Sequence, residues 1–237
     1  MKTIFILTIL SALTFCLCGC GGKPGVSNTD AVSILYDITD PLASKPSNID
    51  GLFGLHQDNS MGALFRLIPV SDIDYTGVQT YSVAAQNALL QNPGERLKTV
   101  NTFFTAIDGA LSELEAQPVG KSNSEIFKVV ARETNYLAGI SAKSRTIYVY
   151  SNLYENTEAF SMYRTSDIEE LLHNPGKVAS IFENEASPQD LSGITINLIY
   201  RAQDYHDSQR FVAISKVYSK IFAAKHAVVK ISASTNP

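Results

Sequence analysis

The sequence predicts an α/β domain with a mainly parallel central sheet of about six strands, one antiparallel edge strand and helices on both faces. Short apolar, β-branched runs alternate along the chain with longer segments in which apolar residues recur every three or four positions. Most of the short runs are almost continuously apolar, which is typical of strands buried on both faces. The helical segments between them supply the right-handed crossovers that parallel strands need, so the order of elements favours a three-layer sandwich.

Six segments are expected to form strands. They are residues 31–37, 63–70, 78–83, 146–151, 194–200 and 227–231. The third segment alternates apolar and polar residues and follows the second closely, so we expect it to be the antiparallel edge strand. A short helix is expected within residues 51–56, between the first two strands.

The helices are predicted from apolar stripes. The clearest stripe follows Pro93 and Gly94 and consists of Leu97, Val100, Phe104, Ile107, Leu111 and Leu114. Residues 122–125 offer a cap for a second helix that carries Ile126 and Leu137. Two shorter helices are expected around 168–172 and 178–182, and a last one over 211–222.

The first nineteen residues have the layout of a secretory signal: Lys2, an apolar stretch and then small residues. The segment Leu17-Cys18-Gly19-Cys20 resembles the bacterial lipobox, and this resemblance implies cleavage before Cys20 and lipidation of that residue. An ordinary signal peptide with an incidental cysteine is the alternative. Four parts are expected: a lipoprotein signal peptide (1–19), a lipidated cysteine with a flexible tether (20–30), one domain (31–232) and a loose C-terminus (233–237).

Composition excludes several classes of function. Each of the three cysteines, Cys16, Cys18 and Cys20, lies in the signal segment, so the processed domain has no thiol for catalysis or for a cysteine-rich zinc site. The net charge of −4 becomes −5 once the segment with Lys2 is removed. An acidic chain with scattered lysines is a poor nucleic-acid binder, so no nucleic-acid partner is expected.

Polar residues follow two of the predicted strands. The first strand ends in Asp37-Ile38-Thr39-Asp40-Pro41, and the fourth runs into Ser151-Asn152-Leu153. In open α/β sheets, ligands gather at the carboxyl ends of strands, where the winding of the sheet reverses. We therefore expect a ligand site where the two turns meet.

At these residues the chain resembles the von Willebrand factor A-like (Rossmannoid) family. That family ends its first strand in Asp-x-Ser/Thr-x-Ser and its fourth in Asp, and completes a metal-ion-dependent adhesion site with a Ser or Thr from a helix-opening loop. The resemblance implies a degenerate Mg²⁺ site formed by Asp37, Thr39, Ser124 and Asn152, with Ser122 as an alternative to Ser124. Pro41 replaces the second serine, and Asn152 replaces the aspartate and so removes one negative charge.

A poorly characterised bacterial branch of that family is the closer resemblance. The residues that carry it are Thr39-Asp40-Pro41-Leu42, Asn92-Pro93-Gly94, Ser124-Glu125-Ile126, Leu191-Ser192-Gly193-Ile194 and Tyr200-Arg201, over residues 31–230.

A purely structural interpretation of the same residues stays open. Asp37 and Thr39 could cap a following helix and hydrogen-bond their own turn, Ser124 could be a helix cap, and Asn152 could bond its own backbone. Other chemistry has less support, because the histidines lack zinc-hydrolase spacing and no nucleophile elbow, Walker loop or dinucleotide turn occurs. Tyr154 lies close enough to the expected site to contact a partner.

The expected function is that of a non-enzymatic, membrane-anchored exported lipoprotein that binds a ligand, most simply another cell-envelope protein. Gly21 after Cys20 favours the periplasmic side of the outer membrane. A structural assembly subunit of an envelope or conjugation-type complex, with a vestigial metal site, is the alternative, and a metal-dependent hydrolase is a third hypothesis.

Overall fold

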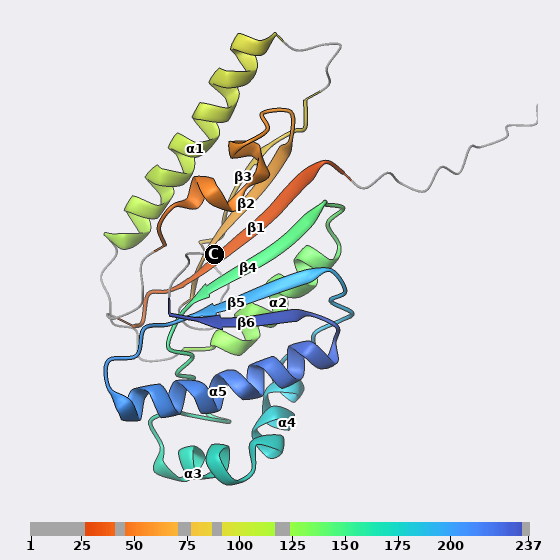
Figure 1. The fold of residues 1–237 in the computed structure, drawn as a ribbon. Coiled ribbons are helices and arrows are strands. Elements are labelled where there is room, and N and C mark those ends of the chain that lie inside the picture. The colour runs from red at the N-terminus through yellow and green to blue at the C-terminus, as the bar shows by residue number, and fades with distance from the viewer. Residues whose placement is uncertain (1–26, 41–45, 71–76, 87–91, 117–123, 234–237) are drawn as a thin grey trace, which may run out of the picture.

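The computed structural model describes residues 27–40, 46–70, 77–86, 92–116 and 124–233. Six strands form one sheet in the order β3-β2-β1-β4-β5-β6 (Figure 1). Their bounds are Thr29–Asp37 (β1), Gly62–Val70 (β2), Gln79–Val83 (β3), Ser144–Tyr150 (β4), Ile194–Ile199 (β5) and Val228–Ser232 (β6). Neighbouring strands are parallel except β2 and β3, which are antiparallel, so the predicted fold class and its edge strand are confirmed.

Helices cover both faces of this sheet and make a Rossmann-like three-layer sandwich. Their bounds are Pro93–Glu115 (α1), Ile126–Ala138 (α2), Thr165–His173 (α3), Pro175–Glu185 (α4) and Tyr205–Ala224 (α5). One apolar core lies between the sheet and α1, and a second lies between the sheet and α2, α4 and α5 (Figure 1). In the part of the chain that the structure describes, no helix combines the length and apolar character needed to cross a bilayer.

The helix expected within 51–56 takes the form of two short 3-10 helices, Ile49–Leu52 and Gly54–His56. Gly51 and Gly54 raise the backbone entropy cost of an α-helix, and Asn48 enters the segment in a left-handed conformation with φ of 53°. The chain therefore crosses the α1 side of the sheet in short turns that bury Phe53 and Leu55 in the core beneath α1.

A buried ion pair joins the middle of the sheet to α2. Arg66 on β2 donates Nε to Oε1 of Glu133 at 2.7 Å and Nη2 to Oε2 at 3.1 Å, while Ser33 on β1 donates to Oε1 at 2.6 Å. The Arg66 guanidinium also lies 3.8 Å from the ring centroid of Tyr136. This network satisfies a carboxylate that is fully buried in the second core.

The strand order places a topological switch point between β1 and β4. The chain leaves β1 toward β2 on one side and leaves β4 toward β5 on the other, so the connections diverge at the carboxyl ends of these two strands. The last paired residues are Tyr36 and Tyr150. The next residue on each strand, Asp37 and Ser151, therefore begins the two turns that face the switch point.

Candidate functional site

Asp37 is the centre of the site at the switch point. Its carboxyl is buried, with 1 % of the residue exposed. Oδ1 accepts hydrogen bonds from Thr39 N at 2.9 Å and Thr39 Oγ1 at 2.6 Å, and Oδ2 accepts one from Ser151 Oγ at 2.6 Å. Burial raises the pKa of Asp37 and outweighs the lowering effect of these hydrogen bonds. Among the described residues, no cation is paired with this carboxyl.

Ser124 reaches the same place from the segment before α2. Its Oγ lies 3.5 Å from Thr39 Oγ1, at the outer limit of a hydrogen bond. Two backbone bonds fix its position, because Asn156 N donates to Ser124 O at 3.0 Å and Ser124 N donates to Asn156 O at 3.4 Å. The structure thus brings Asp37, Thr39 and Ser124 together, whereas Ser122 and Pro41 lie outside the described residues.

Asn152 is placed differently from the other three predicted residues. Its Oδ1 accepts a hydrogen bond from Tyr154 N at 2.8 Å, so the amide bonds its own turn. The contact from β4 to Asp37 is made instead by Ser151, which is fully buried. For Asn152 the structural interpretation describes the observed geometry, and Ser151 is a site residue that the sequence analysis did not select.

The turn after β4 contains a strained residue. Leu153 has φ of 60°, a left-handed conformation that costs a leucine about 1–2 kcal/mol. Its side chain is fully buried, and its N–H donates to Ser151 Oγ at 2.9 Å. The surrounding packing therefore holds this turn in one shape, and that shape presents Ser151 to Asp37.

Glu155 caps α2 and connects the turn after β4 to the Ser124 segment. Its carboxyl accepts hydrogen bonds from Ile126 N at 3.1 Å, Phe127 N at 2.5 Å and the Tyr218 hydroxyl at 2.5 Å. The expected cap at Ser124 is wrong, because α2 begins at Ile126 and its two first N–H groups are bound by this distant glutamate. Burial raises the pKa of Glu155 to about 8, despite hydrogen bonds that lower it.

Tyrosines and one aspartate form the outer part of the rim. The hydroxyls of Tyr154 and Tyr200 donate to Asp207 at 2.7 Å and 2.8 Å, which ties the turns after β4 and β5 to the first turn of α5. Tyr163 packs edge-on against Tyr154, with ring centroids 6.2 Å apart, and is 68 % exposed. Partial burial of the side chain and the nearby carboxyls of Asp37 and Asp40 raise the pKa of Tyr163, which indicates that this largely exposed tyrosine lies near the acidic centre.

The donor set at the rim consists of oxygen atoms. In the described segments, no three histidine, cysteine, aspartate or glutamate side chains gather in a way that could hold a metal ion. A cation at this place would therefore depend on hydroxyl oxygens as well as on the Asp37 carboxylate. Because Thr39 donates its proton to Asp37, the lone pairs of Thr39 Oγ1 remain available to such a cation.

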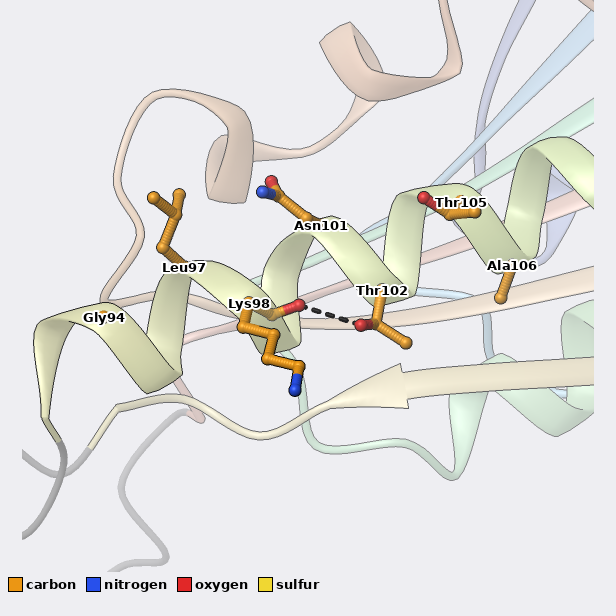
Figure 2. A pocket seen from close by; sticks show the side chains of 7 residues that line it. All are labelled: Gly94, Leu97, Lys98, Asn101, Thr102, Thr105 and Ala106. Atoms are coloured by element: carbon orange, nitrogen blue, oxygen red, sulfur yellow. Dashed lines mark hydrogen bonds between the residues drawn. The ribbon is translucent and has the colours of Figure 1, made fainter.

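A surface hollow of about 570 Å³ lies on the outer side of α1, away from this rim (Figure 2). Figure 2 shows that its lining side chains, among them Leu97 and Lys98, all project from that single helix, where Thr102 Oγ1 donates to Lys98 O at 2.9 Å. Polar groups from different elements do not converge there, whereas they do at the switch point, which is the stronger site.

No protein-family model matches this chain, and no curated protein is significantly similar to it.

Proposed function

We propose that this chain is an exported, lipid-anchored binding module whose ligand sits over the carboxyl ends of β1 and β4. The observation that carries the proposal is the convergence of Thr39, Ser124 and Ser151 on the buried carboxyl of Asp37 at the switch point. The exposed ring of Tyr163 beside this centre provides apolar contact area for a ligand. A domain of this kind binds by shape and charge at the rim and needs no reactive group.

The anchor is supported by the sequence alone. Residues 1–26, which include Cys20, lie outside the described part of the chain. Lipidation of Cys20 would hold the domain at the periplasmic side of the outer membrane, where another envelope protein is the expected partner. The acidic net charge argues against a nucleic-acid ligand.

The rim has the chemistry to hold Mg²⁺ weakly. Asp37 would supply the negative charge, and Thr39 and Ser124 would supply hydroxyl oxygens, which is an oxygen-only donor set of the kind that Mg²⁺ prefers. Asn152 would contribute only through the second lone pair of its Oδ1, since the first accepts from Tyr154 N. Bound Mg²⁺ keeps several positions for water or for ligand oxygens, and with a single carboxylate the affinity of the site is expected to be low.

The test is a thermal-shift titration of the full-length chain with MgCl₂ or MnCl₂ against matched NaCl. At a metal concentration of 100 times Kd, the free energy of unfolding should rise by about 2.7 kcal/mol, which the melting temperature reports. Asp37→Asn keeps the size of the side chain and should abolish the rise, while Asp58→Asn, at an exposed aspartate, should leave it intact. A rise that survives Asp37→Asn, or no rise at all, would contradict the metal site.

A second candidate is an assembly subunit whose rim no longer binds metal. The engagement of Asn152 with its own turn and the lack of an acidic cluster among the described residues favour it. The two functions differ in a pull-down from native membranes. A partner that is retained in the presence of a chelator and with Asp37→Asn supports the assembly role, and one that is lost under both conditions supports the metal-assisted module.

A further inference from the structure

The α1 side of the sheet is only half covered by helices. Helices α2 to α5 pack into the core on the other side, whereas α1 contacts β2 and β3 on this side (Figure 1). Of the described α-helices, α1 is the one that packs here. The part of the sheet formed by β4, β5 and β6 therefore receives no helical layer from the described residues on this side.

The strand register identifies the side chains of this uncovered part. Tyr150 on β4 and Ile199 on β5 belong to the core beneath α1, and alternate residues of a strand share a face. The same face therefore carries six further residues, which we call the open face: Thr146, Tyr148, Thr195, Asn197, Val228 and Lys230. Val228 is 54 % exposed, and Lys230 is the one charged residue of the six. A surface with so few charges is suited to burial against another protein surface.

The outer side of α1 is a second surface of this kind. The residues that line its hollow are small, polar or apolar, with Lys98 as the one charge among them (Figure 2). Leu97 is 50 % exposed there. The hydroxyls of Thr99 and Thr102 donate to carbonyl oxygens of α1 itself, at 3.0 Å and 2.9 Å, so contact with a partner would leave neither hydroxyl unpaired. One molecule thus has both an uncovered sheet face and a helix face able to cover it.

Asp108 on α1 is a carboxylate that lacks a cation. Within the described segments it has no ion-pair partner, and partial burial together with the nearby carboxyl of Asp50 raises its pKa. Its height is set by Arg96, whose Nη2 donates to Met61 O and holds the first turn of α1 at the start of β2. Asp108 lies twelve positions beyond Arg96, which is about 18 Å along the helix.

Lys230 on the open face lies at the same height as Asp108. The strand register aligns Lys230 across the sheet with Asn197, Tyr148, Ile34 and Leu67. Leu67 is five positions beyond the first residue of β2, which is about 17 Å along the strand. Among the residues that the structure describes, Lys230 has no ion-pair partner either. Two uncompensated and opposite charges therefore lie at matching heights on the two halves of this side of the sheet.

We propose that two copies of this chain form a dimer about a twofold axis parallel to the strands, in which α1 of each copy covers the open face of the other. Rotation about such an axis preserves height along the strands, so Asp108 of each copy comes level with Lys230 of the other. Both copies of β1 then start at the same end of the dimer, so the two proposed lipid anchors would enter one membrane. The interface leaves the rim free, so the inference goes beyond the proposed function and does not depend on it.

The area of this contact is sufficient for a specific dimer. The open face crosses three strands over about six residues, which is about 14 Å by 20 Å. The outer face of α1 is about 35 Å long, so it can cover that area completely. Two symmetric contacts, each with a helix side and a sheet side, bury about 1,100 Å² in total, which exceeds the roughly 1,000 Å² expected of a specific interface and predicts a dimer of modest affinity.

Thiol crosslinking of the full-length chain in its native membrane tests the proposal. The three native cysteines lie in the signal segment, so the wild-type chain gives the background. A chain with Asp108→Cys and Lys230→Cys, treated with a short bismaleimide, should give a dimer band on denaturing gels. Each single variant should give none, because neither residue lies near the twofold axis. Glu95→Cys with Lys230→Cys is the matched control and should give none either, since Glu95 lies about 20 Å from Asp108 along α1.

Surface variants distinguish the face of β6 from its edge. Val228→Glu puts an unpaired charge on the open face and should weaken the dimer about tenfold in sedimentation equilibrium of the detergent-solubilised chain. Ile231→Glu, at a residue that is 47 % exposed on the opposite face of the same strand, is the matched control and should leave the dimer unchanged. Asp108→Lys and Lys230→Asp should each weaken the dimer, and the double variant should restore it. Unchanged melting temperatures would show that the variants remain folded.

Four outcomes would overturn the proposal. Absence of a dimer band from the folded Asp108→Cys, Lys230→Cys chain would exclude the contact, and an equally strong band with Glu95→Cys would show that the crosslinks come from random collisions. Equal weakening by Ile231→Glu and Val228→Glu would place the contact at the edge of β6. A crosslinked band whose mass differs from that of two copies would assign the open face to another protein.

Discussion

Two buried glutamates belong to or contact α2, Glu133 within the helix and Glu155 at its N-terminus, and their charges are compensated differently. Glu133, which faces the middle of the sheet, is paired with the guanidinium of Arg66. Glu155, at the rim, accepts hydrogen bonds from three groups of the described residues, and all three are neutral: two backbone N–H groups and the Tyr218 hydroxyl. A cation compensates the first charge, whereas no cation of the described residues contacts the second, and burial raises the pKa of Glu155 to about 8. The charges in the middle of the sheet therefore neutralise each other, while the protonation state of the rim carboxyl depends on pH.

The largest expected effect comes from breaking the compensated pair. Glu133→Leu leaves Arg66 buried without its carboxylate and should lower the free energy of unfolding by about 3–5 kcal/mol. The double variant Arg66→Met with Glu133→Leu removes both charges and should recover most of that loss, because apolar side chains can pack in their place. Urea denaturation of the two single variants and the double variant measures the coupling. A double variant as unstable as Glu133→Leu would mean that the network stabilises the fold through more than its charges.

A smaller effect is expected at the uncompensated glutamate, and it depends on pH. Between the ordinary glutamate pKa of 4.5 and about 8, folded Glu155 keeps a proton that the unfolded chain has lost. Stability should therefore fall as pH rises through this window, by roughly 2 kcal/mol from pH 6 to pH 8, and change little above it. Glu155→Gln cannot ionise and should flatten the curve, although its amide N–H₂ leaves one backbone N–H of α2 without an acceptor.

Urea midpoints at a series of pH values measure this slope in the wild-type chain and in Glu155→Gln. Glu113→Gln, at an exposed position of α1, is the matched control and should keep the wild-type slope. An identical slope in Glu155→Gln would show that another group is responsible.

The elements of the fold were predictable because their signals are local. The stripe from Leu97 to Leu114 has the helical period, and the apolar runs give the strands within one or two residues at most ends. The short helix expected at 51–56 forms as two 3-10 helices and not as one α-helix, because two glycines and a left-handed Asn48 disfavour a continuous α-helix there. Local sequence patterns predicted the strands and helices along the chain. The parallel arrangement of those strands then indicated that the turns after β1 and β4 would meet at the switch point.

The site was predictable only in part, because its contacts join distant segments. The Asp37 turn could be predicted because its residues follow one another at the end of a single strand. The Glu155 cap, in contrast, connects residues 29 positions apart, and Arg66 and Glu133 are 67 positions apart. No periodicity indicates such pairs. Ser151 could have been chosen over Asn152, since opposite residues of paired strands point to the same face and Asp37 comes one position after Tyr36, as Ser151 does after Tyr150.

The smallest expected effect tests whether Asp207, in the outer rim, depends on fixed partners as the buried Glu133 does. Tyr154→Phe removes one of two hydroxyls that donate to Asp207. Because Asp207 is half-buried and water can replace the lost donor, the free energy of unfolding should fall by only about 1 kcal/mol. Tyr163→Phe, at an exposed ring, is the matched control and should cost nothing measurable. A loss above about 3 kcal/mol for Tyr154→Phe would place Asp207 with the buried Glu133 network, as a fixed structural carboxylate whose partners cannot be exchanged for water.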